Sequence, residues 1–286
     1  MTVDREAANS ESRDPSALDT LAEQDQNADV AVAGRQEDTR MGFVRALASV
    51  LFVIALPVAL VTTNVRLLAN APAVYDWAFD RYDAEAATGL SRGDLDATAA
   101  ALRDYFNNGE EIFYHTVTED GIEQPVFNAR ETLHLKDVKS LFVTVNRAQV
   151  VTSLYVLGYV IAFFIWPRDG NLRALATHAL LGLGLGLIVV GGIGVVAALG
   201  FESAFDRFHR ILFANDLWQL DPATDHLIQM FPEPFWRDMT ILLGVMCAVE
   251  ALIIAAFAGV YLVGSRGEHR RLSGRVEMAP TTTQAA

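Results

Sequence analysis

Two histidines stand out because each has a carboxylate about one helical turn away along the chain. His134 lies three residues after Glu131 and three before Asp137, and His209 lies three after Asp206. Residues three apart share one face of a helix, and a carboxylate there can orient an imidazole ring. Histidine has a pKa of about 6.5, so it can accept a proton at neutral pH and return it. The spacing therefore indicates general acid–base chemistry.

Covalent catalysis has little support in the sequence. The single cysteine, Cys247, lies in an apolar stretch, and no G-x-S-x-G motif occurs. One cysteine allows neither an internal disulfide nor a CxxC zinc cluster. A zinc site stays open as an alternative, with His134 and His209 as imidazole ligands and Asp137 or Glu131 as the carboxylate, and it would make the protein a metal-dependent hydrolase. The acid–base interpretation requires no metal and no cofactor.

The other ionisable residues are interpreted mainly as structural. Glu250 lies near the middle of an apolar stretch, where a charge is expensive and functional by default, and the sequence shows no Lys or Arg partner for it. A protonated or hydrogen-bonded packing role is an equal alternative. No chemistry is assigned to the four remaining histidines, which are His115, His178, His226 and His269.

The composition is that of a membrane protein. Of the 286 residues, 52% are hydrophobic and only 20% are charged, whereas about 25% charge is usual in a soluble domain. The 35 Asp and Glu residues outnumber the 22 Lys and Arg residues, which gives a net charge of −13. Binding to phosphates depends on clustered Lys and Arg, so nucleic acid is not an expected partner.

Four apolar stretches are long enough to cross a hydrocarbon core of about 30 Å, which takes about 20 helical residues. They predict an α-helical membrane protein with four transmembrane helices, at about 43–64, 148–166, 174–200 and 239–264. The third stretch is rich in glycine. Because these glycines lie inside a continuous apolar span, they indicate close helix packing and not a phosphate loop. They are Gly182, Gly184, Gly186, Gly191, Gly192 and Gly194.

The segments outside the spans predict the orientation of the protein. Residues 1–42 are acidic and poor in aromatic residues, so we expect a disordered tail. Arginines gather near the span ends on the side that holds this tail, the short connection 167–173 and the tail 265–286. The positive-inside rule then places both termini in the cytoplasm. Loops 65–147 and 201–238 face outward together.

The first and third loops predict a small α+β extracytoplasmic domain. In the first loop, Ser91 can cap a helix that ends at about Asn107, and alternating residues predict a hairpin of strands 112–118 and 122–127. A further helix then leads toward the second span. The third loop contains an amphipathic, aromatic-rich segment typical of helices that lie at a membrane interface.

Both histidine segments resemble motifs of a bacterial family of membrane proteins with four spans. The first is E-x-x-H-L-x-D-V-K, from Glu131 to Lys139. The second is F-H-x-x-x-F-x-N-x-x-W-x-x-D-P, from Phe208 to Pro222, followed by D-x-L-I-x-x-F-P. The similarity covers roughly residues 43–264. The best understood members of this family are the lipoprotein intramolecular transacylases.

The resemblance implies an acyltransferase of the bacterial plasma membrane. In this family an extracytoplasmic histidine pair moves the sn-2 acyl chain of a lipoprotein's diacylglyceryl-cysteine onto the α-amino group of the same cysteine. His134 and His209 occupy the positions of that pair. The implied partners are the diacylglyceryl-modified lipoprotein N-terminus and membrane lipid, and the oligomeric state cannot be read from the sequence. The long acidic tail has no counterpart in the family pattern.

For this chemistry we assign His209 as the general base, oriented by Asp206, and His134 as the partner acid or oxyanion donor, supported by Asp137. Glu131 shares the polar flank of His134. Donors to a developing oxyanion are expected close to His209 in the sequence, and the candidates are Arg210, Asn215 and Trp218. Two alternatives stay open: a non-catalytic membrane scaffold, whose aromatic loop would contact a partner, and the metal-dependent membrane hydrolase.

Overall fold

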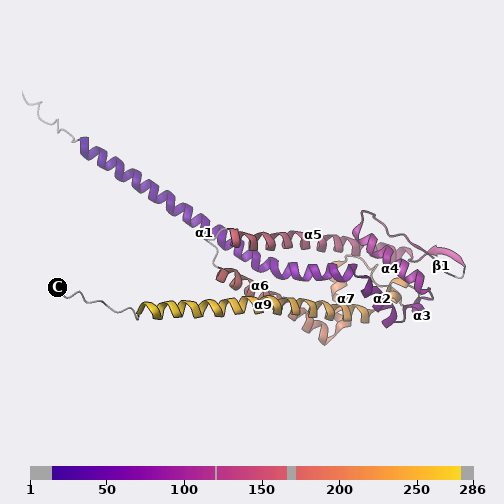
Figure 1. The fold of residues 1–286 in the computed structure, drawn as a ribbon. Coiled ribbons are helices and arrows are strands. Elements are labelled where there is room, and N and C mark those ends of the chain that lie inside the picture. The colour runs from indigo at the N-terminus through magenta and orange to yellow at the C-terminus, as the bar shows by residue number, and fades with distance from the viewer. Residues whose placement is uncertain (1–14, 120, 166–171, 278–286) are drawn as a thin grey trace, which may run out of the picture. The chain divides into compact units, whose positions relative to one another are not determined.

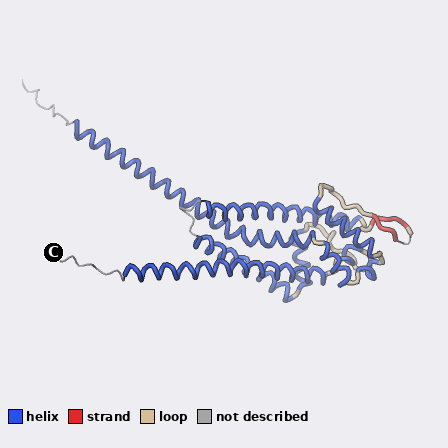
Figure 2. Tube along the Cα trace, viewed as in Figure 1, coloured by secondary structure: helices blue, strands red, loops and turns tan. Residues whose placement is uncertain are grey.

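The computed structural model describes residues 15–119, 121–165 and 172–277, and most of them are helical (Figures 1 and 2). The helices are α1 (Pro15–Asn70), α2 (Pro72–Arg81), α3 (Ala84–Thr88), α4 (Arg92–Asn107), α5 (Ala129–Ile165), α6 (Leu172–Leu199), α7 (Phe201–Leu212), α8 (His226–Met230) and α9 (Glu233–Glu277). The strands are β1 (Thr116–Glu119) and β2 (Ile122–Pro125). The chain divides into two units, residues 1–50 and 51–286, and α1 belongs to both.

The first unit differs from what the sequence predicts. The sequence predicts disorder over residues 1–42, whereas the structure forms α1 as a helix from Pro15 onward. Residues 16–41 contain no proline and many Ala, Glu, Gln and Arg residues, which favour the helix. Low hydrophobicity prevents a segment from building a core, but it does not prevent helix formation. The remaining part of the predicted tail, residues 1–14, lies outside the described residues.

Four stretches of helix are long and apolar enough to cross a membrane, which confirms the predicted four-span architecture. They are Thr39–Asn70, Ala129–Ile165, Leu172–Leu199 and Glu233–Gly264. The second and fourth begin well before the predicted spans, because no glycine or proline interrupts residues 129–147 or 235–238. Residues 166–171, at the predicted short connection, lie outside the described part of the chain.

Two of the six glycines in the third span make the close helix approach that the sequence predicts. A Cβ atom on Gly182 would lie 3.0 Å from the carbonyl oxygen of Val53, and one on Gly186 would lie 2.9 Å from the Cβ of Pro57. Side chains at these two positions would prevent the close approach of α1 and α6. The other four glycines meet no other helix within 4 Å.

The intramembrane carboxylate has a polar partner on another helix. Asn64 of α1 is fully buried, and its Nδ2 donates a hydrogen bond of 2.8 Å to Oε2 of Glu250 on α9. This contact favours the hydrogen-bonded packing interpretation of Glu250. It could not be read from the sequence, because 186 residues separate the two side chains.

The elements outside the membrane helices share one core, which lies at one end of those helices (Figure 1). Leu95 and Tyr105 of the first loop belong to the same buried cluster as Met230 and Phe231 of the third loop. Buried residues of both loops thus belong to one cluster. This shared core is what brings segments far apart in the sequence to the same place.

Local sequence explains the elements of this domain. The side chain of Ser91 accepts a hydrogen bond from the backbone N–H of Asp94 and caps α4, as predicted. Strands β1 and β2 form an antiparallel hairpin in which Thr116 lies opposite Pro125. The hairpin is shorter than predicted, since the residues before Thr116 leave the ladder.

Candidate functional site

The structure brings the two histidines of the sequence motifs together. His134 lies near the start of α5 and His209 near the end of α7, and the centroids of their rings are 6.2 Å apart. Both are buried, with 7% of His134 and 8% of His209 exposed. Two imidazoles at this distance are close enough for a reacting group between them to contact both.

Hydrogen bonding fixes the tautomer of one histidine. Nδ1 of His209 lies 2.7 Å from the backbone oxygen of Phe205, and a carbonyl oxygen can only accept, so Nδ1 carries the proton. In the neutral ring Nε2 is then the basic nitrogen. Nδ1 of His134 is buried and has no hydrogen-bond partner among the described residues.

Aromatic rings surround the pair. His209 stacks on Trp218 with 5.0 Å between ring centroids and meets the edge of Phe205 at 4.3 Å. Phe213 contacts both histidines, at 5.3 Å from His134 and 5.6 Å from His209. Burial among these rings lowers the pKa of His209, although the hydrogen bond to Phe205 and the charge of Asp206 oppose the shift. The environment therefore favours a neutral imidazole.

No hydrogen bond joins Asp206 to His209, the ring that it is predicted to orient, in the described part of the chain. Its carboxylate instead accepts a hydrogen bond of 2.8 Å from Nε of Arg210. This ion pair lowers the pKa of Asp206. The physical reason is that Arg210 lies four residues along the same helix, the best spacing for a pair, while the ring nitrogen reaches the carbonyl of the preceding turn.

Asp137 also bonds elsewhere. Its Oδ2 accepts a hydrogen bond of 2.8 Å from Nδ2 of Asn215, so it does not orient His134 as predicted. The same bond occupies one of the two amide N–H donors of Asn215, a residue that the sequence suggests as an oxyanion donor. Arg210 is also engaged, and its side chain is 62% exposed. Of the predicted oxyanion donors, only Trp218 combines contact with His209 and an indole N–H that makes no hydrogen bond to the described residues.

Glu131 has a structural role in the site. One of its oxygens accepts from the backbone N–H of Asn128 at 2.7 Å, and the other accepts from the backbone N–H of Leu227 at 2.7 Å. The side chain of Asn128 caps the same helix end in return, through the backbone N–H groups of Arg130 and Glu131. Glu131 thereby ties the start of α5, which carries His134, to the start of α8.

The histidines line a cavity of about 400 Å³ whose walls are mainly apolar and aromatic. Its walls come from α1, α2, α4, α5, α7, α8 and α9, and include Val65, Leu68, Val138 and Leu243. Such a cavity suits hydrocarbon chains, with a few polar groups to fix orientation.

Glu233 is a candidate residue that the sequence reasoning missed. Glu233 is half-buried and lines the cavity, and its carboxylate makes no hydrogen bond or ion pair with the described residues. It is the only acidic side chain among the described residues that line this cavity. The Pro-Glu-Pro segment at the start of the fourth membrane helix is typical of a helix start, so the sequence gives no reason to expect a substrate-binding residue there.

The residues of the zinc alternative do not gather. Among the described residues, no group of three or more His, Cys, Asp or Glu side chains is arranged to hold a metal ion. The carboxylate of Asp137 bonds Asn215, and that of Glu131 bonds backbone N–H groups, so neither completes a ligand set with the imidazoles.

Comparison with known proteins identifies relatives of this fold. The model of the family described as lipoprotein intramolecular transacylase Lit matches residues 50–236. A solved structure of the membrane-integral lipoprotein intramolecular transacylase Lit from Bacillus cereus aligns with a TM-score of 0.66 and 18% identity, over 79% of this chain and 99% of that one. A structure of the same protein with a histidine-to-arginine mutation aligns with a TM-score of 0.64 and 18% identity, over 82% and 99%. The search of curated proteins found no match.

Proposed function

This chain belongs to the lipoprotein intramolecular transacylase family, and from this premise we propose that it moves one acyl chain of a diacylglyceryl-modified lipoprotein onto the α-amino group of the lipoprotein's N-terminal cysteine. It is a bacterial membrane protein with four helices long and apolar enough to span the bilayer. The product of the proposed reaction is a lyso-form lipoprotein.

One observation carries this proposal: two buried imidazoles from distant loops line the same apolar cavity. An apolar cavity accommodates acyl chains, and paired imidazoles supply proton transfer. In an ester-to-amide exchange the protein has to provide little else, because an amide is more stable than an ester and no energy source is needed. The donor ester and the acceptor amine sit on one substrate, so binding them in one pose gives a high effective concentration.

The proposed reaction balances as a proton relay. The neutral amine nitrogen attacks the carbonyl carbon of the sn-2 ester, and a C–N bond forms. Nε2 of His209 accepts the proton that the nitrogen loses. The ester C–O bond then breaks, and the same proton passes to the glycerol oxygen that leaves. We assign His209 as the base because its tautomer leaves Nε2 free to accept.

His134 and Trp218 are proposed to assist on the oxyanion side. His134 lies within 6.2 Å of His209 between ring centroids, so it faces the same reacting carbon from another direction. The indole N–H of Trp218 has no other partner among the described residues. Each group can donate a hydrogen bond from a ring N–H. Fixed donors of this kind stabilise the negative charge that develops on the carbonyl oxygen.

Glu233 is proposed to bind the substrate's amine before the reaction. The α-amino group has a pKa of about 8, so it arrives mainly as a cation at neutral pH. An unpaired carboxylate at the wall of an apolar cavity attracts that cation. This contact would place the amine in the cavity.

We propose that the small α+β domain faces away from the cytoplasm and that both termini are cytoplasmic. The support is the distribution of arginine near the span ends. Lipoproteins carry their lipid-modified N-terminus on the outer side, so the cavity would then meet the substrate directly.

The test is acyl transfer by the purified full chain in liposomes that contain a synthetic diacylglyceryl-cysteine lipopeptide. Substrate and product are isomers of equal mass, so fragment ions must locate the acyl chain on glycerol or on nitrogen. We expect an N-acyl, mono-acylglyceryl product with the wild type. The proposal fails if the lipopeptide stays unchanged while the protein remains folded, or if free fatty acid is released in place of the amide.

The same assay separates the enzyme from the scaffold and hydrolase alternatives. A scaffold would show no transfer and would tolerate substitution of either histidine. A metal-dependent hydrolase would release fatty acid and lose activity with a chelator, whereas the proposed transfer should be insensitive to chelation.

A further inference from the structure

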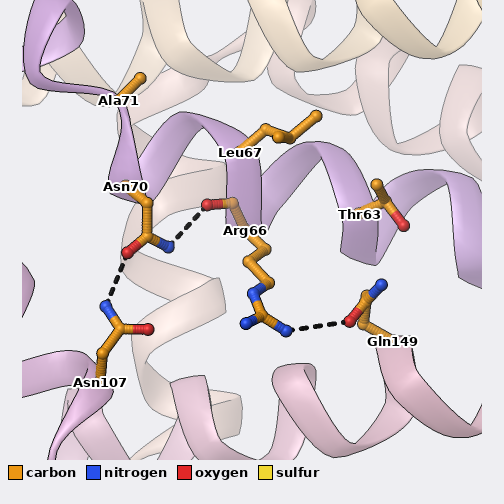
Figure 3. Close-up of a pocket in the computed structure, with 7 residues that line it drawn as sticks. All are labelled: Thr63, Arg66, Leu67, Asn70, Ala71, Asn107 and Gln149. Carbon is orange, nitrogen blue, oxygen red and sulfur yellow. Dashed lines mark hydrogen bonds between the residues drawn. The ribbon is translucent and has the colours of Figure 1, made fainter.

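A second cavity, of about 600 Å³, opens where the last turns of α1 meet α4 and α5 (Figure 3). Its polar lining comes from Arg66 and Asn70 on α1, Asn107 on α4 and Gln149 on α5. In Figure 3 the side chain of Arg66 points toward Gln149, and that of Asn70 points toward Asn107. Two polar pairs from three helices therefore border the same hollow.

This cavity lies on a different face of α1 from the one that contains the histidines. Val65, Leu68 and Ala69 line the histidine cavity, whereas Arg66 and Leu67 line the second one. The two hollows are separated by the last turns of α1. The second cavity thus has no part in the mechanism proposed above.

The second cavity carries an unneutralised positive charge. The guanidinium of Arg66 donates one hydrogen bond of 3.2 Å, to Oε1 of Gln149, and forms no ion pair with any described carboxylate. Arginine has five N–H donors in a planar fork, so most of them stay available. Such a fork matches the oxygens of a phosphate group and binds them in pairs.

The amide groups around Arg66 hold the cavity in shape. Nδ2 of Asn107 donates to Oδ1 of Asn70 at 2.6 Å and to the backbone oxygen of Arg103 at 2.7 Å. Nδ2 of Asn70 donates to the backbone oxygen of Arg66 at 2.8 Å. The side-chain oxygen of Asn107 makes no hydrogen bond to the described residues, so it can accept from a hydroxyl or ammonium group of a ligand.

The position along the helices indicates the source of the anion. The first apolar stretch ends at about residue 64 and the second begins at about 148, so Arg66 and Gln149 stand where hydrocarbon gives way to lipid headgroups. Leu67, which is 54% exposed, lines the same cavity beside the arginine. A phosphate with apolar surface next to it is the chemistry of a glycerophospholipid, whereas free phosphate would gain nothing from the leucine.

We propose that this cavity binds the headgroup of an anionic membrane glycerophospholipid, with its phosphodiester on Arg66 and its headgroup hydroxyls on the amide of Asn107. The diacylglyceryl-cysteine substrate carries no phosphate, so the bound lipid is not the substrate. It joins the end of α1 to α4 and α5, the helices that border the histidine cavity from the other side.

The test uses native mass spectrometry of the full chain released from detergent micelles that contain phosphatidylglycerol or, separately, diacylglycerol. Arg66→Gln should retain about fivefold less phosphatidylglycerol than the wild type. Arg147→Gln is the matched control, since Arg147 is exposed and lies two residues before Gln149 on α5 but does not line the cavity. It should retain phosphatidylglycerol within about twofold of the wild type. Diacylglycerol, which lacks the phosphate, should be retained by none of the three.

Three results would overturn the proposal. They are equal retention by the wild type and Arg66→Gln, equal loss in both arginine variants, and retention of diacylglycerol as strong as that of phosphatidylglycerol. Inorganic phosphate is the second probe: if about 10 mM phosphate displaces the lipid completely, the cavity is a free-anion site and not a lipid site. Should Arg66→Gln fold poorly, Gln149→Ala provides an independent test. It removes the hydrogen bond that holds the guanidinium of Arg66 at the cavity, and it should therefore also lower lipid retention.

Discussion

Replacement of His209 by alanine tests the mechanism most directly. Of the two cavity histidines, His209 is the one whose tautomer is fixed, with Nδ1 bonded to the backbone oxygen of Phe205 at 2.7 Å and Nε2 free to accept. Loss of a positioned general base lowers a rate by about 10²–10⁴-fold, which equals about 3–5 kcal/mol in the activation barrier. We expect a loss of turnover in this range for the lipopeptide assay, with the substrate still bound.

His226→Ala is the control for the loss of a histidine as such. His226 donates from Nδ1 to the backbone oxygen of Val126 at 2.8 Å and does not line the histidine cavity. Its loss should cost about 1 kcal/mol of stability and leave turnover within about threefold of wild type. The assignment of His209 is refuted if His209→Ala keeps more than about a tenth of wild-type turnover, or if both variants lose activity equally.

The pH dependence follows from the same residue. Burial lowers the pKa of His209 below its usual value of 6.5, so the base stays neutral at and above that pH. The rate should therefore rise with pH up to the pKa of the substrate amine, about 8, with no second inflection from the base between about pH 6.5 and 7.5. Unfolded histidine takes up a proton below about 6.5 while folded His209 resists it, so its contribution to stability is lost as pH falls through that range.

Three further changes probe other parts of the structure. Glu233→Gln should raise the KM for the amine substrate about tenfold, with a smaller effect on kcat. The control Glu202→Gln, on the exposed start of α7, should change neither constant. Equal KM values for the two variants would contradict the proposed ammonium contact. Glu131→Gln should lower the melting temperature by roughly 4–8 °C, since it weakens about 2 kcal/mol of charged hydrogen bonds to two backbone N–H groups. Gly186→Val should lower the melting temperature and Gly184→Val should not. Of these two positions, only a Cβ at 186 would meet another helix. Equal melting temperatures would contradict the close α1–α6 contact.

The four membrane spans could be predicted because the length of an apolar stretch depends only on consecutive residues. About 20 consecutive apolar residues indicate each of the four spans, and the residue type of Ser91 indicates the start of α4. The tail at residues 1–42 shows the limit of such reading. Its composition favours disorder, yet residues 16–41 are rich in good helix formers, and the structure has a helix from Pro15 onward.

The two histidines could be chosen from the sequence, but their partners could not. Spacing shows which side chains share a helix face, and it placed Asp206 within reach of His209. It does not show which of several acceptors a donor will choose. The carbonyl of Phe205, four residues before His209 on the same helix, accepts the hydrogen bond from Nδ1 of the ring, and Arg210 gives Asp206 a charged partner four residues along the helix. Competition among nearby donors and acceptors thus decides which hydrogen bonds these side chains form.

Burial of His209 favours completion of the proposed transfer. A cationic amine paired with Glu233 enters as a neutral couple and releases one proton to solvent before it attacks. The second proton, which the nitrogen gives to His209 after the C–N bond forms, creates an imidazolium in surroundings that lower the pKa of that ring. Burial thus makes the protonated intermediate costly and the return of the proton to the leaving glycerol oxygen favourable. A carboxylate on the ring, as first expected from Asp206, would stabilise the imidazolium and slow that return. The backbone carbonyl that takes its place fixes the tautomer without adding a full negative charge.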